Sequence, residues 1–320
     1  MKKLLLIWIT IVLVCVACGQ PSGSFKSNPI KVGLLLPETI NDPVWGSKGY
    51  KGLLKIQSEL NADVYYKENI KTRDAVKQAL AEFDDQGVTL VFGHGSEYGL
   101  FFKEFHSLYP HIEFIYFNGE FVADNVTSIK FNSYAMGFFG GMVAAKMSGT
   151  KKLGIIAAFD WQPEVRGFIE GANFEDPTIT ITVDYTKSWS NDEKALEIYK
   201  RMENKGADVY YPAGDTFNMV LVEQIKEDGL YAIGFVSDQS DLGETTVLTS
   251  TVQHVDELYE LIASEFIAGK LEHVPKSFDF AEGVITLGEF SPEVPQDYQT
   301  KIEKAVDIYI KTGKLPNEYE

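Results

Sequence analysis

Short apolar runs alternate with stretches of helical periodicity along most of the 320-residue chain. The runs are nearly continuous, which is typical of parallel strands that are buried on both faces of a sheet. In the first half, strands are predicted at residues 30–37, 62–67, 88–95 and 112–119. Helices are predicted between them, over about 43–60, 74–83 and 98–109. This order favours a doubly wound parallel sheet with right-handed crossovers.

The alternation starts again in the second half. Strands are predicted at residues 125–132, 152–159, 178–185, 207–214, 231–236 and 247–253. Helices are predicted at residues 136–147, 163–173, 192–205, 217–228 and 255–269, and two short strands precede a last helix at 296–312. A second Rossmann-like lobe follows from this pattern. Passages between the lobes near Phe131, Thr251 and Phe280 would form a three-stranded hinge.

The chain length agrees with two lobes, because about 300 residues exceed what one core usually organises. An apolar fraction of 45% indicates a globular protein. The predicted N-terminal lobe comprises residues 29–131 and about 252–280. The predicted C-terminal lobe comprises residues 132–251 and about 281–320.

The N-terminus predicts export and anchoring. A basic Met1–Lys3 segment precedes the apolar run Leu4–Ala17, which is shorter than the roughly 20 residues of a transmembrane helix. The run ends in CVAC followed by GQPSGS, which resembles a bacterial lipobox. Residues 1–17 are therefore expected to be a signal peptide, with Cys18 lipidated, residues 18–28 a tether, and the domain on the outer face of the cell membrane. An unlipidated signal anchor is the alternative.

Charge and cysteine content exclude several classes of protein. The two cysteines, Cys15 and Cys18, both lie in this segment, so the mature domain has no disulfide framework and no thiol nucleophile. The formal charge of −17 becomes −19 when Lys2 and Lys3 are removed with residues 1–17. Phosphate-backbone binding requires clustered Lys and Arg, and the sequence has no such stripe. This argues against direct nucleic-acid binding, and no motif indicates a cofactor or a metal.

Polar and aromatic residues follow many of the predicted strands. Ligands of open α/β sheets bind outside the carboxyl ends of the strands, and two such sheets joined by a hinge can close on a ligand. The strand-end residues are Glu38, Asn41, Asp42, His94, Ser96, Glu97, Asn118, Phe159, Trp161, Trp189, Asp192, Asp215, Phe217, Asp238 and Gln239. Helix capping and turn formation are the alternative roles for the small polar residues in this set.

Catalysis has one candidate centre, in which His94 would act with Ser96 and Glu97. The sequence has no G-x-S-x-G nucleophile elbow and no phosphate-loop pattern, so binding is favoured over hydrolysis.

Five segments resemble, in order, the sequence blocks of the basic membrane protein (BMP) lipoproteins. The segments are NDPVWGSKGYKG, SIKFNSYAMGFFGGMVAAKMS, KLGIIAAFDWQPEVRGFIEGANF, SWSNDEKALEIYKRMENKGADVYYPAG and YAIGFVSDQSDLGETTVLTSTVQHVDELYE. The resemblance covers nearly all of residues 31–315. It implies an α/β fold of the type I periplasmic-binding-protein-like class, similarity to purine-nucleoside-binding components of ABC importers, and no catalysis. Several blocks are most similar to a member described as a positive regulator of competence genes.

The resemblance implies a pocket in which a purine is stacked between two aromatic rings. Trp45, which follows Asp42, matches the first ring, and Trp189 with Asp192 matches the second. Gly214 matches the glycine of the family's loop. Trp45 and Trp189 are therefore expected to face one another when the lobes close.

Three positions that are charged in the family are neutral here. Val236 replaces an acid that would bind ribose, Gln253 replaces a lysine, and Asn118 replaces another acid. Asp238 is expected to shape its loop together with Gln239. The ligand-site residues predicted from strand ends and resemblance together are Asn41, Asp42, Trp45, His94, Asn118, Trp189, Asp192, Gly214, Asp238 and Gln253.

Three functions remain open from the sequence. The first is a solute-binding lipoprotein that takes a small, nucleoside-like ligand and works with an ABC permease or a membrane signalling partner. The second is a regulator of competence-gene transcription without a role in transport. The third is the hydrolase centred on His94.

Overall fold

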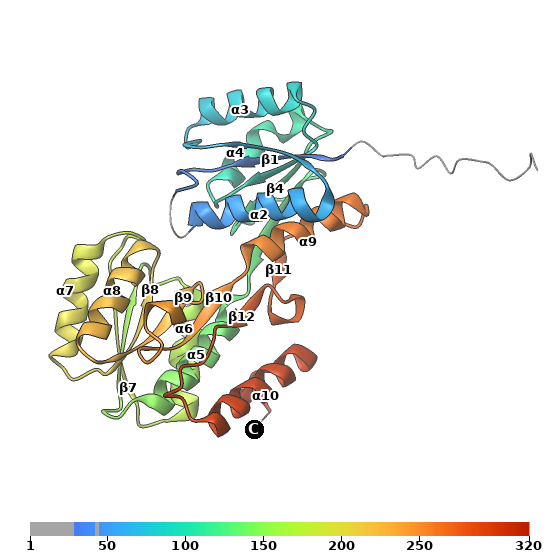
Figure 1. The fold of residues 1–320 in the computed structure, drawn as a ribbon. Coiled ribbons are helices and arrows are strands. Elements are labelled where there is room, and N and C mark those ends of the chain that lie inside the picture. Colours follow the sequence, from blue (N-terminus) through green and yellow to red (C-terminus); the bar gives the residue numbers. More distant parts are fainter. Residues whose placement is uncertain (1–28, 42–44, 320) are drawn as a thin grey trace, which may run out of the picture.

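Two six-stranded sheets organise the computed structural model, which describes residues 29–41 and 45–319 (Figure 1). The first sheet has the strand order β11-β5-β4-β3-β1-β2, and all of its paired strands are parallel. Its strands are β1 (Lys31–Leu35), β2 (Asp63–Lys67), β3 (Leu90–Gly93), β4 (Glu113–Phe117), β5 (Val126–Phe131) and β11 (Lys276–Phe278). Its helices are α2 (Trp45–Leu60), α3 (Arg73–Asp85), α4 (Tyr98–Phe105) and α9 (Val255–Ile267), with the short η1 (His106–Leu108).

The second sheet repeats this arrangement in the order β12-β10-β9-β8-β6-β7. Its strands are β6 (Lys152–Ala157), β7 (Thr180–Tyr185), β8 (Val209–Ala213), β9 (Tyr231–Val236), β10 (Val247–Gln253) and β12 (Ile285–Leu287). Only β12 is antiparallel to its neighbour among these described strands. Its helices are α5 (Ser133–Met147), α6 (Pro163–Glu175), α7 (Asp192–Glu203), α8 (Thr216–Glu227) and α10 (Gln296–Thr312), with η2 (Ser240–Leu242) and η4 (Pro316–Glu318).

Three connections join the two lobes, as Figure 1 shows. The chain leaves the first sheet at the end of β5 and enters α5 of the second lobe. It returns from β10 into α9, which packs against α2. It crosses a third time from β11 through η3 (Phe280–Glu282) to β12. The predicted three-stranded hinge is present, whereas the assignment of the connecting residues to one lobe or the other stays a prediction.

Glycines let α5 and α6 cross at very short range. A Cβ atom built on Gly137 would lie 2.0 Å from the carbonyl oxygen of Glu164, and one on Gly171 would lie 1.9 Å from that of Phe138. A Cβ atom on Gly140, on the same helix as Gly137, would meet side chains only, the nearest being that of Ile233 at 3.3 Å. The small-residue sequence of α5 therefore serves backbone-to-backbone packing.

One element boundary differs from the predicted one because a side chain forms hydrogen bonds with the backbone there. The strand predicted from Thr178 begins two residues later, because the Asp176 carboxylate accepts hydrogen bonds from the Thr178 amide and hydroxyl at 2.9 and 2.7 Å. Such an Asx turn competes with strand pairing. No helix among the described residues is both long and apolar enough to span a membrane.

Candidate ligand site at the strand ends

His94 and Trp45 form one rigid unit in the first lobe. The two rings are stacked, with centroids 4.4 Å apart and an interplanar angle of 15°. His94 Nε2 donates to the Trp45 carbonyl oxygen at 2.8 Å, and Nδ1 is hydrogen-bonded to the Tyr259 hydroxyl at 2.7 Å. The Trp45 indole N–H donates back to the His94 carbonyl oxygen at 3.3 Å. These bonds tie the first turn of α2 and the middle of α9 to the end of β3.

The prediction that His94 contacts a ligand is corrected by this geometry. Its side chain has 0% exposure, and both ring nitrogens are engaged by protein atoms. His94 is also unsuited to the catalytic role of the hydrolase alternative, because neither nitrogen is directed at Ser96. It positions Trp45, which remains only partly buried at the strand ends.

Two other predicted residues of the first lobe are exposed. Asn41 lies in the turn after β1, and Asn118 directly follows β4. Asn118 has φ of 55°, a left-handed conformation that asparagine tolerates better than most residues. Asp42 lies outside the described residues, as does the predicted lipidation site Cys18.

The second lobe carries three aromatic side chains after β6 and β7. Trp189 makes edge contacts with Phe159 and Trp161, at centroid distances of 5.4 and 5.8 Å. Phe159 and Trp161 are stacked at 5.6 Å, and Trp161 is 62% exposed. Trp161 is one of the predicted strand-end residues but does not belong to the predicted ligand site. Its sequence signal was the segment FDWQ immediately after an apolar strand.

Trp45 and Trp189 make no ring contact with each other in the described structure. Each packs on aromatic rings of its own lobe. Their expected approach across the lobes is therefore not seen in this conformation.

Asp192 and Gly214 lie at the junction of α7 and α8. Asp192 begins α7 and accepts a hydrogen bond from the Thr216 hydroxyl at 3.2 Å. A Cβ atom on Gly214 would lie 2.0 Å from the Phe217 ring, so only glycine fits there. Asn218 donates to the Gly214 carbonyl oxygen at 2.5 Å. These contacts explain the local loop, and Asp192 remains partly exposed.

Asp238 and Gln239 shape the loop after β9, as expected. The Asp238 carboxylate accepts from the backbone amides of Ser240 at 3.1 Å and Glu289 at 2.9 Å. The buried Gln239 side chain accepts from the Phe235 amide at 2.9 Å and donates to the Asn218 side chain at 2.6 Å. Asp238 is exposed but has two backbone partners.

Val236 ends β9 in a conformation that is unfavourable for its side chain. Its φ is 64°, and it is 4% exposed. A β-branched residue rarely adopts positive φ, because the branch collides with the backbone. Val236 is the position at which the resemblance implies a ribose-binding acid, although Val236 itself is not among the predicted ligand-site residues.

Gln253 and Lys48 meet where the lobes join. Gln253 ends β10, is 8% exposed, and donates through its side-chain amide to the Ser133 hydroxyl at 3.1 Å. Lys48 of α2 donates to the Gln253 carbonyl oxygen at 3.0 Å. Burial lowers the pKa of Lys48 to about 8, against an opposing attraction from Asp256. Sequence reasoning missed Lys48, although it lies three residues after Trp45 and thus on the same side of the helix.

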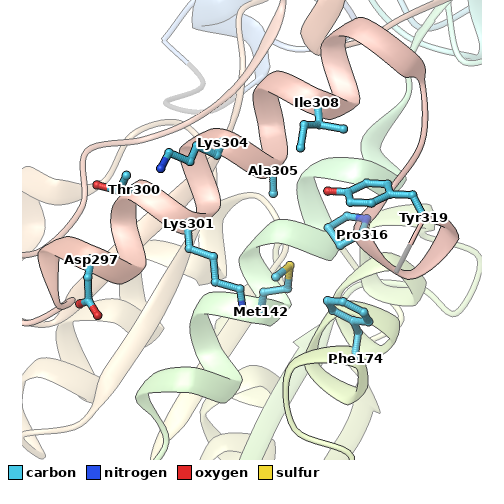
Figure 2. Close-up of a pocket in the computed structure, with 10 residues that line it drawn as sticks. All are labelled: Met142, Phe174, Asp297, Thr300, Lys301, Lys304, Ala305, Ile308, Pro316 and Tyr319. Carbon is cyan, nitrogen blue, oxygen red and sulfur yellow. The ribbon is translucent and has the colours of Figure 1, made fainter.

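A separate cavity of about 360 Å³ lies on the second lobe, between α10 and the helices α5 and α6. Figure 2 shows Tyr319 and Pro316 beside Ile308 at one end of it and Asp297 and Thr300 at the other. Its lining residues are Met142, Phe174, Asp297, Thr300, Lys301, Lys304, Ala305, Ile308, Pro316 and Tyr319. None of them belongs to the predicted site, and Lys301 is paired with Glu175 at 2.8 Å. In the described part of the chain, no group of three or more His, Cys, Asp or Glu residues is arranged to hold a metal.

A family profile described as "ABC transporter substrate-binding protein PnrA-like" matches residues 30–319. The chain belongs to the Bmp family. It is 53% identical over 307 residues to "Transcriptional activator protein med" of Bacillus subtilis, and the alignment covers 96% of each protein. It is 23% identical over 314 residues to basic membrane protein A1 of Borrelia garinii, covering 95% of this chain and 92% of the relative. The predicted resemblance to the BMP proteins, and to the member named a transcriptional activator, is confirmed.

Solved structures of Bmp-like fold agree with the observed architecture. A transcriptional activator of the comK gene from Bacillus halodurans has a TM-score of 0.86 at 46% identity, covering 89% of this chain and 99% of that one. An ABC transporter solute-binding protein from Conexibacter woesei has a TM-score of 0.73 at 18% identity, covering 91% and 100%. The two lobes thus have the predicted type I periplasmic-binding-protein-like fold. The family is one of binding proteins, which favours binding over hydrolysis for this chain.

Proposed function

We propose that this Bmp protein is an extracytoplasmic lipoprotein, anchored through Cys18, that binds a small planar ligand between its lobes and acts in regulation. The observation that carries the proposal is the placement of Trp45. Its ring is fixed by the fully buried His94, yet it is only partly buried itself and lies at the carboxyl ends of the first sheet. A preorganised aromatic face in that position suits a stacked ligand.

The second lobe offers matching aromatic surface after β6 and β7. Trp189 and the exposed Trp161 lie at the carboxyl ends of the second sheet. Closure about the three connections would bring this surface toward Trp45, with the ligand between them. Stacking on each face of a base contributes about 1 to 3 kcal/mol. A nucleoside-like compound meets these requirements, because it has a planar ring and is small enough to be enclosed.

Two relatives of high sequence identity favour regulation over uptake. The Bacillus subtilis relative is named a transcriptional activator, and so is the solved Bacillus halodurans protein. The formal charge of −17 argues against contact with DNA by this chain, so the route to transcription would be indirect. A membrane signalling protein or an ABC permease would bind the closed, ligand-bound form and thereby respond to the ligand.

The second candidate is a regulator of competence-gene transcription with no role in transport and no need of a ligand. The neutral Val236 and Gln253 favour it, because the family positions that would bind a sugar have lost their charges. Under this candidate the lobes would serve as a docking unit. Substitutions of the site residues would then leave transcription of the regulated genes unchanged.

Ligand binding is tested with the full chain in detergent, using inosine and inosine 5′-monophosphate as probes. We expect the Trp45→Ala and Trp189→Ala variants each to weaken binding by about tenfold or more, which corresponds to one lost stacking face. Tyr66→Ala is the matched control, because Tyr66 is an exposed aromatic residue at the far edge strand β2. Binding that is indifferent to both tryptophans would contradict the proposal.

Regulation is tested with a competence-gene reporter in a Bacillus strain whose own copy of the relative is deleted. We expect complementation by the wild-type chain, and its loss in Cys18→Ser and in the Trp45→Ala, Trp189→Ala double variant at equal protein levels. Full reporter activity in the double variant would instead favour the ligand-independent candidate.

A further inference from the structure

Lys48 connects the two lobes at the candidate site. It lies one helical turn after Trp45 on α2, so the two side chains share one side of the helix. Its ammonium group reaches the carbonyl oxygen of Gln253, the last residue of β10 in the second sheet, at 3.0 Å. A positive charge therefore lies beside the aromatic face proposed to stack the ligand, at a point where both lobes contribute atoms.

The charge of Lys48 has no ion-pair partner among the described residues. An ammonium group has three donors, and the Gln253 carbonyl oxygen takes one of them. Lys55, two turns further along α2, shows the ordinary arrangement: it pairs with Glu257 of α9 at 2.6 Å, and that pairing raises its pKa. Lys48 differs, since burial lowers its pKa despite the nearby Asp256. A partly buried cation with spare donors is suited to an anionic partner.

Neutral hydrogen-bonding groups lie beside Lys48 on the second-lobe side. The Gln253 amide and the Ser133 hydroxyl lie together at 3.1 Å on the second-lobe side. Val236, at the end of the neighbouring strand β9, pairs in register with Val252 and carries no charge. Asp256 and Lys51 are the charged groups that act on Lys48 most strongly after burial, and they oppose each other. Asp256 is therefore the one acid among these strongest neighbours, and Lys51 counters its effect on an anion placed at Lys48.

We propose that Lys48 recognises an anionic group on the ligand, so that the site takes a planar ring bearing a phosphate, such as a nucleoside monophosphate, in preference to the neutral nucleoside. This inference rests on the proposed stacking of a planar ligand between the lobes. Trp45 would hold the ring while Lys48, three residues on, holds the phosphate. A charge-assisted hydrogen bond of this kind is among the strongest that a side chain makes.

Lys48 has one competing role, which is to hold the lobes together through its bond to Gln253. Three variants separate the two roles. Lys48→Gln keeps a hydrogen-bond donor but removes the charge, whereas Lys48→Arg keeps the charge. Lys51→Gln removes the same charge one turn away, from an exposed side chain, and serves as the matched control.

The experiment measures dissociation constants of inosine and inosine 5′-monophosphate for the full chain in detergent, with inorganic phosphate as a third probe. We expect the wild type to bind the monophosphate at least about tenfold more tightly than inosine. That preference should fall to about one in Lys48→Gln and persist in Lys48→Arg and Lys51→Gln. Inorganic phosphate alone should bind weakly, because it lacks the ring.

Several results would overturn the inference. The first is equal binding of inosine and its monophosphate by the wild type. The second is a preference for the monophosphate that persists in Lys48→Gln. The third is a loss of that preference in Lys51→Gln as large as the loss in Lys48→Gln. If equal binding still requires Trp45 and Trp189, the proposed function stands without the anion. If neither compound binds the wild type, both proposals fail. Urea unfolding of each variant verifies that the fold is retained.

Discussion

The His94 ring lies 4.4 Å from that of Trp45 and is inclined to it by only 15°, while its Nε2 donates to the Trp45 carbonyl oxygen at 2.8 Å. One buried side chain thus fixes both the backbone and the ring of the residue proposed to stack the ligand. A carbonyl oxygen can only accept, so Nε2 carries a hydrogen, while Nδ1 is hydrogen-bonded to the Tyr259 hydroxyl.

The first prediction concerns this unit. His94→Phe keeps an aromatic ring but leaves the Trp45 carbonyl and the Tyr259 hydroxyl without their partner. We expect the free energy of unfolding to fall by about 2 to 4 kcal/mol, because two buried polar groups lose a hydrogen bond. Tyr259→Phe, which removes one hydroxyl, should cost about 1 to 2 kcal/mol. Urea denaturation measures both, and a His94→Phe variant as stable as the wild type would refute the positioning role.

A second prediction follows from the strained backbone at Val236. Val252 is its register partner and has similar exposure, 5% against 4%, but lies within the regular strand β10. Replacing either by glycine removes the same buried side chain, while only Val236→Gly also relieves the strain at φ of 64°. We expect Val236→Gly to be less destabilising than Val252→Gly by about 1 to 3 kcal/mol. Equal losses in urea denaturation would show that Val236 is unstrained.

The helix crossing gives a third prediction. Gly137→Ala places a methyl group 2.0 Å from the Glu164 carbonyl oxygen, so α5 and α6 must separate. We expect a loss of roughly 2 to 4 kcal/mol, within the range for severe overpacking. Gly140→Ala should change stability by less than about 1 kcal/mol, since its nearest contact is 3.3 Å and alanine favours the helix. Similar melting temperatures for the two variants would argue against the close crossing.

Lys48 predicts how the free energy of unfolding depends on pH. Its pKa is about 8 in the folded protein and 10.5 when unperturbed, so between these values the unfolded chain binds more protons. The contribution of Lys48 to the free energy of unfolding of the wild type therefore rises as the pH increases from about 8 to 10.5. At pH 7 the shift disfavours the folded state by about 3 kcal/mol, and the bond to Gln253 offsets about 1 kcal/mol. We expect Lys48→Met to be more stable than the wild type by about 2 kcal/mol at pH 7.

The advantage of Lys48→Met should disappear by about pH 10.5, where both states of the wild type lose the proton. Urea denaturation of the two proteins at pH 7, 8.5 and 10 measures the difference directly, so that titrations common to both cancel. A constant difference across this range would mean that burial does not penalise the ammonium group.

Periodicity predicted the strands and helices well, because parallel strands buried on both faces leave continuous apolar runs. It failed where one side chain took over a backbone group, as Asp176 does before β7. The residues of the ligand site were harder to predict from the sequence. A histidine at a strand end has the same sequence signal whether it contacts a ligand or, like His94, supports the residue that does. Lys48 was missed because its hydrogen-bond partner, Gln253 of β10, lies some 200 residues away along the chain.

The central claim is that Trp45 and Trp189 contact the same ligand from opposite lobes. A double-mutant cycle tests it most directly, with the dissociation constant of inosine 5′-monophosphate measured for the wild type, Trp45→Ala, Trp189→Ala and the double variant. The two rings make no contact in the structure described here, so coupling between them must pass through the ligand. We predict a coupling free energy of about 1 kcal/mol or more. Strictly additive effects would contradict a shared ligand between the lobes.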